Sequence, residues 1–201
     1  MICPALRRPF STRRVDPLIV LVGLVALAFA LIAPRGARAE APSPSFAAAA
    51  ARIDPSCVGV AVRESGRAKS RGAGFALRSG GIVVTAAHVV AGIADLAARL
   101  PDGREATARL IGSDEVSDVA LLRVAADLAP ITPAPDGSAR RGDPVAAIGD
   151  PLGFSATLTV GHLSSTTRAW EDTSPYDLLQ HDAALNPGSS GGPLVDPEGR
   201  V

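Results

Sequence analysis

The stretch QHDAALNPGSSGGPLV, residues 180–195, decides the fold of this chain. Taken alone, a segment so rich in glycine and serine would be a flexible loop. This loop is short, however, and glycines flank Ser190 on both sides, at Gly188 and Gly191. Glycine lets the backbone turn so that neighbouring N–H groups point toward one position. Such N–H donors can stabilise an oxyanion, and losing one donor costs about 3 kcal/mol in a known enzyme. The stretch therefore predicts that Ser190 is a nucleophile.

Two upstream segments supply the partners that a nucleophilic serine needs. These are TAAHVV (85–90), which contains His88, and SDVALLRV (117–124), which contains Asp118. Taken singly, His88 would be a packed core residue and Asp118 a turn residue. The pattern G-x-S-x-G around Ser190 is also typical of α/β-hydrolases, but there the acid and the histidine follow the serine. Eleven residues follow Ser190 and none is histidine. The order His, Asp, Ser is that of the chymotrypsin-like arrangement.

The three motifs resemble those of trypsin-like serine proteases, most closely the bacterial HtrA (Deg) branch, and residues 147–168 resemble the same branch. This resemblance covers residues 56–201. It implies that Ser190 attacks a peptide carbonyl, that His88 transfers the proton, and that Asp118 orients His88. It further implies an oxyanion hole built from backbone N–H groups of the nucleophile loop, namely those of Gly188, Ser189 and Ser190.

The same resemblance implies a substrate pocket beside the nucleophile loop, formed by Ala184, Leu185 and Asn186. Ala184 takes the position of the pocket floor, and it carries no acid. We therefore expect small or medium aliphatic side chains such as Val, Ala or Leu to be preferred over Lys and Arg. Trypsin-type enzymes have Asp at the position of Ser189, where it pairs with a newly cut N-terminus. Ser189 thus argues against activation by propeptide cleavage.

Short apolar segments separated by turn residues are typical of β-strands, and Asp102-Gly103 predicts a hairpin turn. A Pro-rich connection at residues 129–136 divides the segments into two groups. We expect an all-β fold with two six-stranded β-barrels, the first in residues 56–128 and an incomplete second barrel in residues 140–201. The predicted strands are residues 57–62, 72–77, 82–90, 96–100, 104–112, 119–124, 143–149, 156–168, 177–183 and 193–196.

The N-terminal segment, residues 1–39, predicts export. Four arginines precede an uninterrupted run of sixteen apolar residues at 18–33, and Ala37-Arg38-Ala39 follows. This is the order of a secretory signal peptide, with cleavage after Ala39. The run is shorter than the ~20 residues that span a bilayer, but an uncleaved anchor that tethers the chain to the membrane stays open. Either interpretation puts the rest of the chain outside the cytoplasm: periplasmic, secreted, or on the outer face of the cytoplasmic membrane. Residues 40–55 are a linker or a short Ala-rich helix.

Composition excludes several classes of partner and cofactor. The formal net charge is zero and no basic stripe stands out, so we expect no nucleic-acid partner. Cys57 is alone once Cys3 is removed, which leaves no internal disulfide. Three histidines without a cysteine cluster make no convincing metal site, and we interpret His162 and His181 as surface or strand residues. We expect no metal and no cofactor.

The end of the chain differs from the family that it resembles. That family needs roughly two more strands after Ser190, so we expect a C-terminally truncated second barrel ending at Val201. Two hypotheses stay open. The first is a serine endopeptidase that acts on unfolded polypeptides in extracytoplasmic protein quality control. The second is a catalytically inactive relic or binding module of the same fold. The resemblance also suggests a homotrimer.

Overall fold

The computed structural model describes residues 45–64, 67–150, 153, 156–169 and 177–201. The predicted signal peptide or anchor, including its apolar run at 18–33, lies outside these residues. Among the described residues, no helix is both long enough and apolar enough to cross a membrane.

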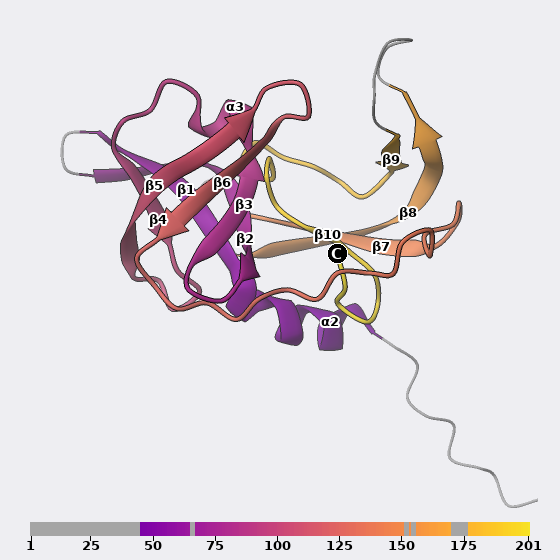
Figure 1. Cartoon of the computed structure of the whole chain (residues 1–201). Helices are drawn as coiled ribbons and strands as arrows, with labels where there is room; N and C mark the ends of the chain where they lie inside the picture. The colour runs from indigo at the N-terminus through magenta and orange to yellow at the C-terminus, as the bar shows by residue number, and fades with distance from the viewer. Residues whose placement is uncertain (1–44, 65–66, 151–152, 154–155, 170–176) are drawn as a thin grey trace, which may run out of the picture. The chain divides into compact units, whose positions relative to one another are not determined.

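Six antiparallel strands from the first half of the chain close into a barrel in the order β1-β2-β3-β6-β5-β4 (Figure 1). Successive side chains of a strand point to opposite faces, and the inward-facing ones are mostly aliphatic. Val60, Val83 and Leu122 are fully buried at the centre of this core. The prediction of an all-β first barrel is confirmed. Its strands are β1 (Cys57–Glu64), β2 (Arg67–Arg78), β3 (Ile82–Ala86), β4 (Leu96–Arg99), β5 (Glu105–Asp114) and β6 (Val119–Val124).

A second sheet of four strands, in the order β10-β7-β8-β9, follows the barrel in the sequence. It has its own core, in which Ala146, Ile148 and Val195 pack with Ile53 and Cys57 from the start of the domain. This sheet is the partial second barrel that the sequence predicts. Its strands are β7 (Pro144–Gly149), β8 (Thr157–Arg168), β9 (Leu178–His181) and β10 (Leu194–Val195).

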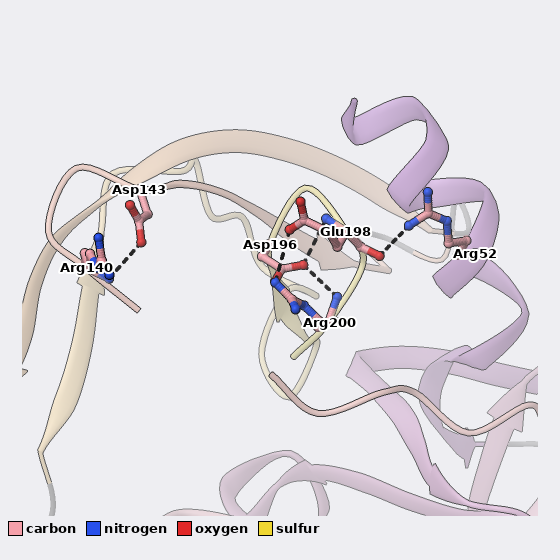
Figure 2. Close-up of polar contacts among 6 residues, drawn as sticks. All are labelled: Arg52, Arg140, Asp143, Asp196, Glu198 and Arg200. Atoms are coloured by element: carbon pink, nitrogen blue, oxygen red, sulfur yellow. Dashed lines mark hydrogen bonds and ion pairs between the residues drawn. The ribbon is translucent and has the colours of Figure 1, made fainter. Parts of the chain in front are cut away.

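The Ala-rich segment ahead of β1 is a helix, α2 (Phe46–Ile53), followed by a 3-10 turn, η1 (Asp54–Ser56). Ser45 caps the helix by accepting a hydrogen bond from the N–H of Ala48 (3.3 Å). At the other end of the helix, the Arg52 guanidinium donates to the carbonyl of Glu198 (2.6 Å), as Figure 2 shows. This bond attaches α2 to the turn that follows β10.

That turn is held closed by its own ion pairs. Arg200 donates through Nε to the Asp196 carboxylate (2.7 Å) and lies 3.2 Å from the Glu198 carboxylate (Figure 2). The carboxylate of Asp196, ahead of that of Glu198, raises the pKa of Arg200. The C-terminal turn is thus fixed both internally and against the helix.

Two predicted strand boundaries differ from the structure by more than two residues. β2 begins at Arg67 rather than at residue 72, because the polar residues before Gly72 continue the β1–β2 hairpin, with Val62 opposite Lys69. The predicted strand 82–90 ends early, at Ala86, and its last residues form α3 (Ala87–Val90), a one-turn helix. The helical conformation of residues 87–90 is linked to the contacts of His88, which lies on α3.

Candidate active site

His88 lies on α3, which begins where the pairing of β3 with β6 stops. The final pair of that ladder is Ala86 with Val119, and the N–H of Ala87 then donates to the carbonyl of Asp118 (3.0 Å). Val89 is buried in the barrel core, whereas the His88 side chain is 60% exposed. The short helix therefore anchors itself through valine and presents the imidazole to solvent.

Asp118 makes two contacts with the same histidine. Its Oδ2 lies 2.7 Å from Nδ1 of His88, and its Oδ1 accepts the backbone N–H of His88 at 2.9 Å. Because the first N–H groups of a helix have no partner within the helix, the second contact satisfies one of them and stabilises α3 at this point. A proton on Nδ1 satisfies the first contact and leaves Nε2 free to accept a proton. The pair is therefore arranged for general-base chemistry.

The backbone of Asp118 has a positive φ of 53°, a conformation that few residues other than glycine adopt. The preceding turn is ordered by Asp114, which accepts hydrogen bonds from the Ser117 hydroxyl (2.8 Å) and the Val116 N–H (3.0 Å). The bond from Ser117, followed by that from Val116, holds the pKa of Asp114 below its ordinary value. An ionised Asp114 thus stabilises the turn that delivers Asp118 to His88.

Ser190 comes from the second half of the chain, and its backbone is bonded to the barrel. The N–H of Ala73 donates to the carbonyl of Ser190 (2.8 Å), and the carbonyl of Ala73 accepts the hydroxyl of buried Thr85 (2.7 Å). Gly72 leaves the necessary space, because a Cβ there would lie 2.7 Å from Ser190 O and 2.8 Å from a methyl of Val89. The nucleophile loop and α3 therefore both pack on Gly72.

Gly191 brings the same loop against the end of β3. Its φ is +82°, and a Cβ on it would lie 2.7 Å from the N–H nitrogen of Ala86 and would collide with the carbonyl of Ala73. Only a glycine allows this close approach. Because Ala86 is two residues before His88, the contact puts the backbone next to Ser190 close to the start of α3.

The amides of the loop differ in their hydrogen bonding. The N–H of Ser189 donates to the carbonyl of Asn186 (2.9 Å), so it is already used within the loop. Gly188 has a φ of 105°, and its carbonyl accepts the N–H of Asp150 (3.0 Å). Within the part of the chain that the structure describes, no hydrogen bond is found for the N–H groups of Gly188 and Ser190. Among the described residues of the loop, these two amides are therefore free to donate to a bound group.

Two cavities are lined by the predicted site residues. One, of about 240 Å³, is lined by Ser190 together with Leu185, Asn186 and His181. Ala184, the third predicted pocket residue, does not line it, and its carbonyl accepts the Thr159 hydroxyl (2.8 Å).

A second cavity, of about 560 Å³, is lined by His88, Asp118, Ile93, Leu110 and Glu115. Both cavities are thus bordered by residues that the sequence predicts for the site.

Sequence reasoning assigned no role to Thr85 or to Asp150. Thr85 stands inside a quoted motif, and its hydroxyl supports the carbonyl of Ala73, the residue that holds Ser190. Asp150 follows the apolar segment 144–149 directly, and it is 4% exposed. A charged residue directly after a strongly apolar segment could have indicated that Asp150 has a specific role. His162 and His181 lie on β8 and β9, and the described residues contain no cluster of metal ligands.

Comparison with known proteins agrees with this geometry. Residues 72–201 match the family model described as a trypsin-like peptidase domain. The chain is 45% identical over 135 residues to "Probable periplasmic serine endoprotease DegP-like" of Hahella chejuensis (strain KCTC 2396), covering 67% of this chain and 29% of that protein. A protein of the same name from Marinomonas sp. (strain MWYL1) is 40% identical over 139 residues, covering 69% of this chain and 30% of that protein.

Solved structures are similar as well. The HtrA-type protease AlgW with a tripeptide superposes with a TM-score of 0.71 at 36% identity, covering 79% of this chain and 52% of that one. The same protease with a decapeptide gives a TM-score of 0.70 at 32% identity, covering 78% and 57%. The chain thus spans less than a third of these curated relatives and about half of the solved structures. By motif order, fold and sequence, this chain belongs to the trypsin-like peptidases and is homologous to the HtrA/DegP serine endoproteases.

Proposed function

We propose that this chain is a serine endopeptidase in which Ser190, His88 and Asp118 form the catalytic triad. The observation that carries the proposal is the double contact of Asp118 with His88, at 2.7 Å to the ring and 2.9 Å to the backbone. A carboxylate that holds both groups sets the position of the imidazole and its tautomer. The glycine-flanked loop of Ser190, bonded to Ala73 of the same barrel, supports the third member.

The reaction runs in two halves. In the first, Oγ of Ser190 attacks the peptide carbonyl carbon while His88 Nε2 takes the hydroxyl proton, and the N–H groups of Gly188 and Ser190 stabilise the oxyanion. The C–N bond then breaks, and His88 returns the proton to the leaving amine, which leaves an ester on Ser190. In the second half, water loses a proton to His88, attacks the ester carbonyl, and releases the acid and the free serine hydroxyl. Asp118 holds the ring of His88 in place and stabilises the imidazolium that forms.

The substrate is a polypeptide with a small or medium aliphatic side chain before the cleaved bond. The cavity beside Ser190 is lined by Leu185 and Ile148, and none of the described residues that line it is an acid that would hold a Lys or Arg side chain. AlgW structures were solved with a tripeptide and a decapeptide, which supports polypeptide substrates here.

The site of action is extracytoplasmic. The relatives from Hahella and Marinomonas are named periplasmic, and the N-terminal segment of this chain has the pattern of a signal peptide or anchor. We accordingly place its role in protein quality control, on unfolded exported proteins, with a homotrimer as the assembly that follows from the HtrA relationship.

Labelling with a fluorophosphonate tests the proposal. The probe phosphonylates a serine only when a neighbouring base activates it, so it separates an assembled triad from an unassembled one. We expect the full chain to be labelled at Ser190 and to hydrolyse casein. Ser190→Ala should abolish both, and His88→Ala should reduce both by several orders of magnitude. A folded full chain that is neither labelled nor active on casein contradicts the proposal and favours the inactive binding module.

A further inference from the structure

Asp150 is the one charged side chain of the described residues that is fully buried, with 4% of the residue exposed. It follows β7 of the second sheet, and its carboxylate packs against the outer face of the barrel, since Gly59 and Arg99 alternate with the core residues Val58, Val60 and Ala98. Oδ2 lies 3.6 Å from Nη1 of Arg99 on β4, and the Ser70 hydroxyl donates to the same oxygen at 3.4 Å. A buried charge is costly unless it is paired and hydrogen-bonded, so this carboxylate depends on its partners from the barrel.

The outer face of the barrel has space for this carboxylate because residue 59 is glycine. A Cβ on Gly59 would collide with Oδ2 of Asp150, and Gly59 has no positive φ that would itself require glycine. The absence of a side chain at this point of β1 is therefore matched to the carboxylate. Replacing Gly59 by alanine displaces Asp150 without changing a charge.

The backbone of Asp150 holds the nucleophile loop. Its N–H donates to the carbonyl of Gly188 (3.0 Å), and the preceding Gly149 packs so tightly that a Cβ there would lie 2.7 Å from Cα of Ser189. Arg99 makes a second contact with the same connection, because Nη1 donates to the carbonyl of Gly153 (2.5 Å). A continuous set of contacts thus runs from β4 of the barrel through residue 150 to the loop that contains Ser190.

We propose that Arg99 and Asp150 form a positioning pair between the barrel and the second sheet, which fixes the Gly188 carbonyl and so orients the oxyanion amides. The pair touches no reacting atom and acts only through the loop. This inference rests on the proposed function for its catalytic consequence. A misplacement of about 1 Å in an active site can lower the rate roughly 100-fold. We therefore expect the pair to control kcat.

Three variants test the pair: Asp150→Asn, Arg99→Met and Gly59→Ala. The matched controls are Asp102→Asn and Arg104→Met, because these residues form an ion pair of the same kind (2.6 Å) that is exposed and lies in the turn after β4. Two readouts are taken from the full chain. One is kcat and KM on a peptide substrate. The other is backbone hydrogen exchange of residues 186–192, measured by mass spectrometry in a Ser190→Ala background so that it does not depend on activity.

We expect each of the three variants to lower kcat 10- to 100-fold with KM changed less than twofold. We also expect the loop to exchange at least tenfold faster, while the controls change neither quantity. Arg99→Lys, which keeps the charge, should recover part of the loss. Loop exchange equal to that of the controls overturns the inference, even if the melting temperature falls, because the pair would then be merely structural. If the parent chain is inactive, the proposed function fails, and loop exchange still decides about the pair. If Asp150→Asn or Arg99→Met fails to fold, kcat and loop exchange are compared between the parent chain and Gly59→Ala, which removes no charge.

Discussion

Cys57 offers a test of the packing between α2, the barrel and the second sheet. Its thiol is a free, buried cysteine at the start of β1. Burial, with a smaller contribution from the nearby carboxylate of Asp54, raises the pKa of Cys57 from 9.0 to about 12. The folded state therefore keeps the thiol protonated under conditions in which the unfolded chain has already lost the proton.

The difference in the pKa of Cys57 between the folded and unfolded states decides how stability changes with pH. Below pH 9 both states are protonated and stability does not depend on the thiol. Between pH 9 and pH 12 the unfolded state binds fewer protons than the folded state, so the free energy of unfolding falls as pH rises. Each pKa unit corresponds to about 1.4 kcal/mol. At pH 10, one unit above the ordinary value, Cys57 should therefore lower the stability by about 1.4 kcal/mol.

Urea unfolding at pH 8, 9 and 10 measures this loss, in a Cys3→Ala background that leaves Cys57 as the only thiol. The control is Cys57→Ala in the same background. The alanine variant loses the same packing at every pH, and its residue 57 cannot titrate. The contributions of all other titrating groups therefore cancel when the free energies of unfolding of the two proteins are subtracted. The stability difference between the two proteins should shrink by about 1.4 kcal/mol between pH 8 and pH 10. A constant difference across this range would refute the assignment of a buried, protonated thiol.

Three further outcomes follow from the geometry. Asp118→Asn should lower kcat by about 10⁴ in steady-state assays, as in the trypsin-like triad, because the NH₂ of the asparagine would face Nδ1 of His88. Its melting temperature should change little, since Oδ1 still accepts the His88 N–H. A variant with unchanged kcat would contradict the role given to Asp118. Gly191→Ala should destabilise the fold by more than the ~1–2 kcal/mol of a left-handed non-glycine residue, since its Cβ would also collide with the Ala73 carbonyl; a smaller loss on urea unfolding argues against the close approach. Leu122→Ala should cost about 3–5 kcal/mol in the same assay, because Leu122 is fully buried in the barrel, whereas Leu110→Ala, at a half-exposed position, should cost much less.

The sequence was most informative where chemistry limits the choice of residue. Order alone selected the chymotrypsin-like arrangement, because no histidine follows Ser190. The strongly apolar run at residues 119–124 was enough to predict β6 within the barrel. These features are local, so a single sequence contains them.

Other features depend on contacts between distant segments. The apolar run 82–90 reads as one strand, yet its last four residues form α3 because the Asp118 carboxylate, thirty positions later, takes the N–H of His88. The pairing of Asp150 with Arg99 joins residues from two sheets, and neither neighbourhood in the sequence indicates it. Local propensity cannot predict such contacts, because they form only when the sheets meet.

The division of the proposed triad between the two halves of the fold has a consequence for the order of folding. His88 and Asp118 both belong to the barrel, whose six strands are consecutive in the sequence, from Cys57 to Val124. Domains of a chain made from its N-terminus fold as units in the order in which they emerge. During synthesis the contact between Asp118 and His88 can therefore form before residues 180–195 are made. The proposed triad is complete only when the segment that contains Ser190 docks against Ala73.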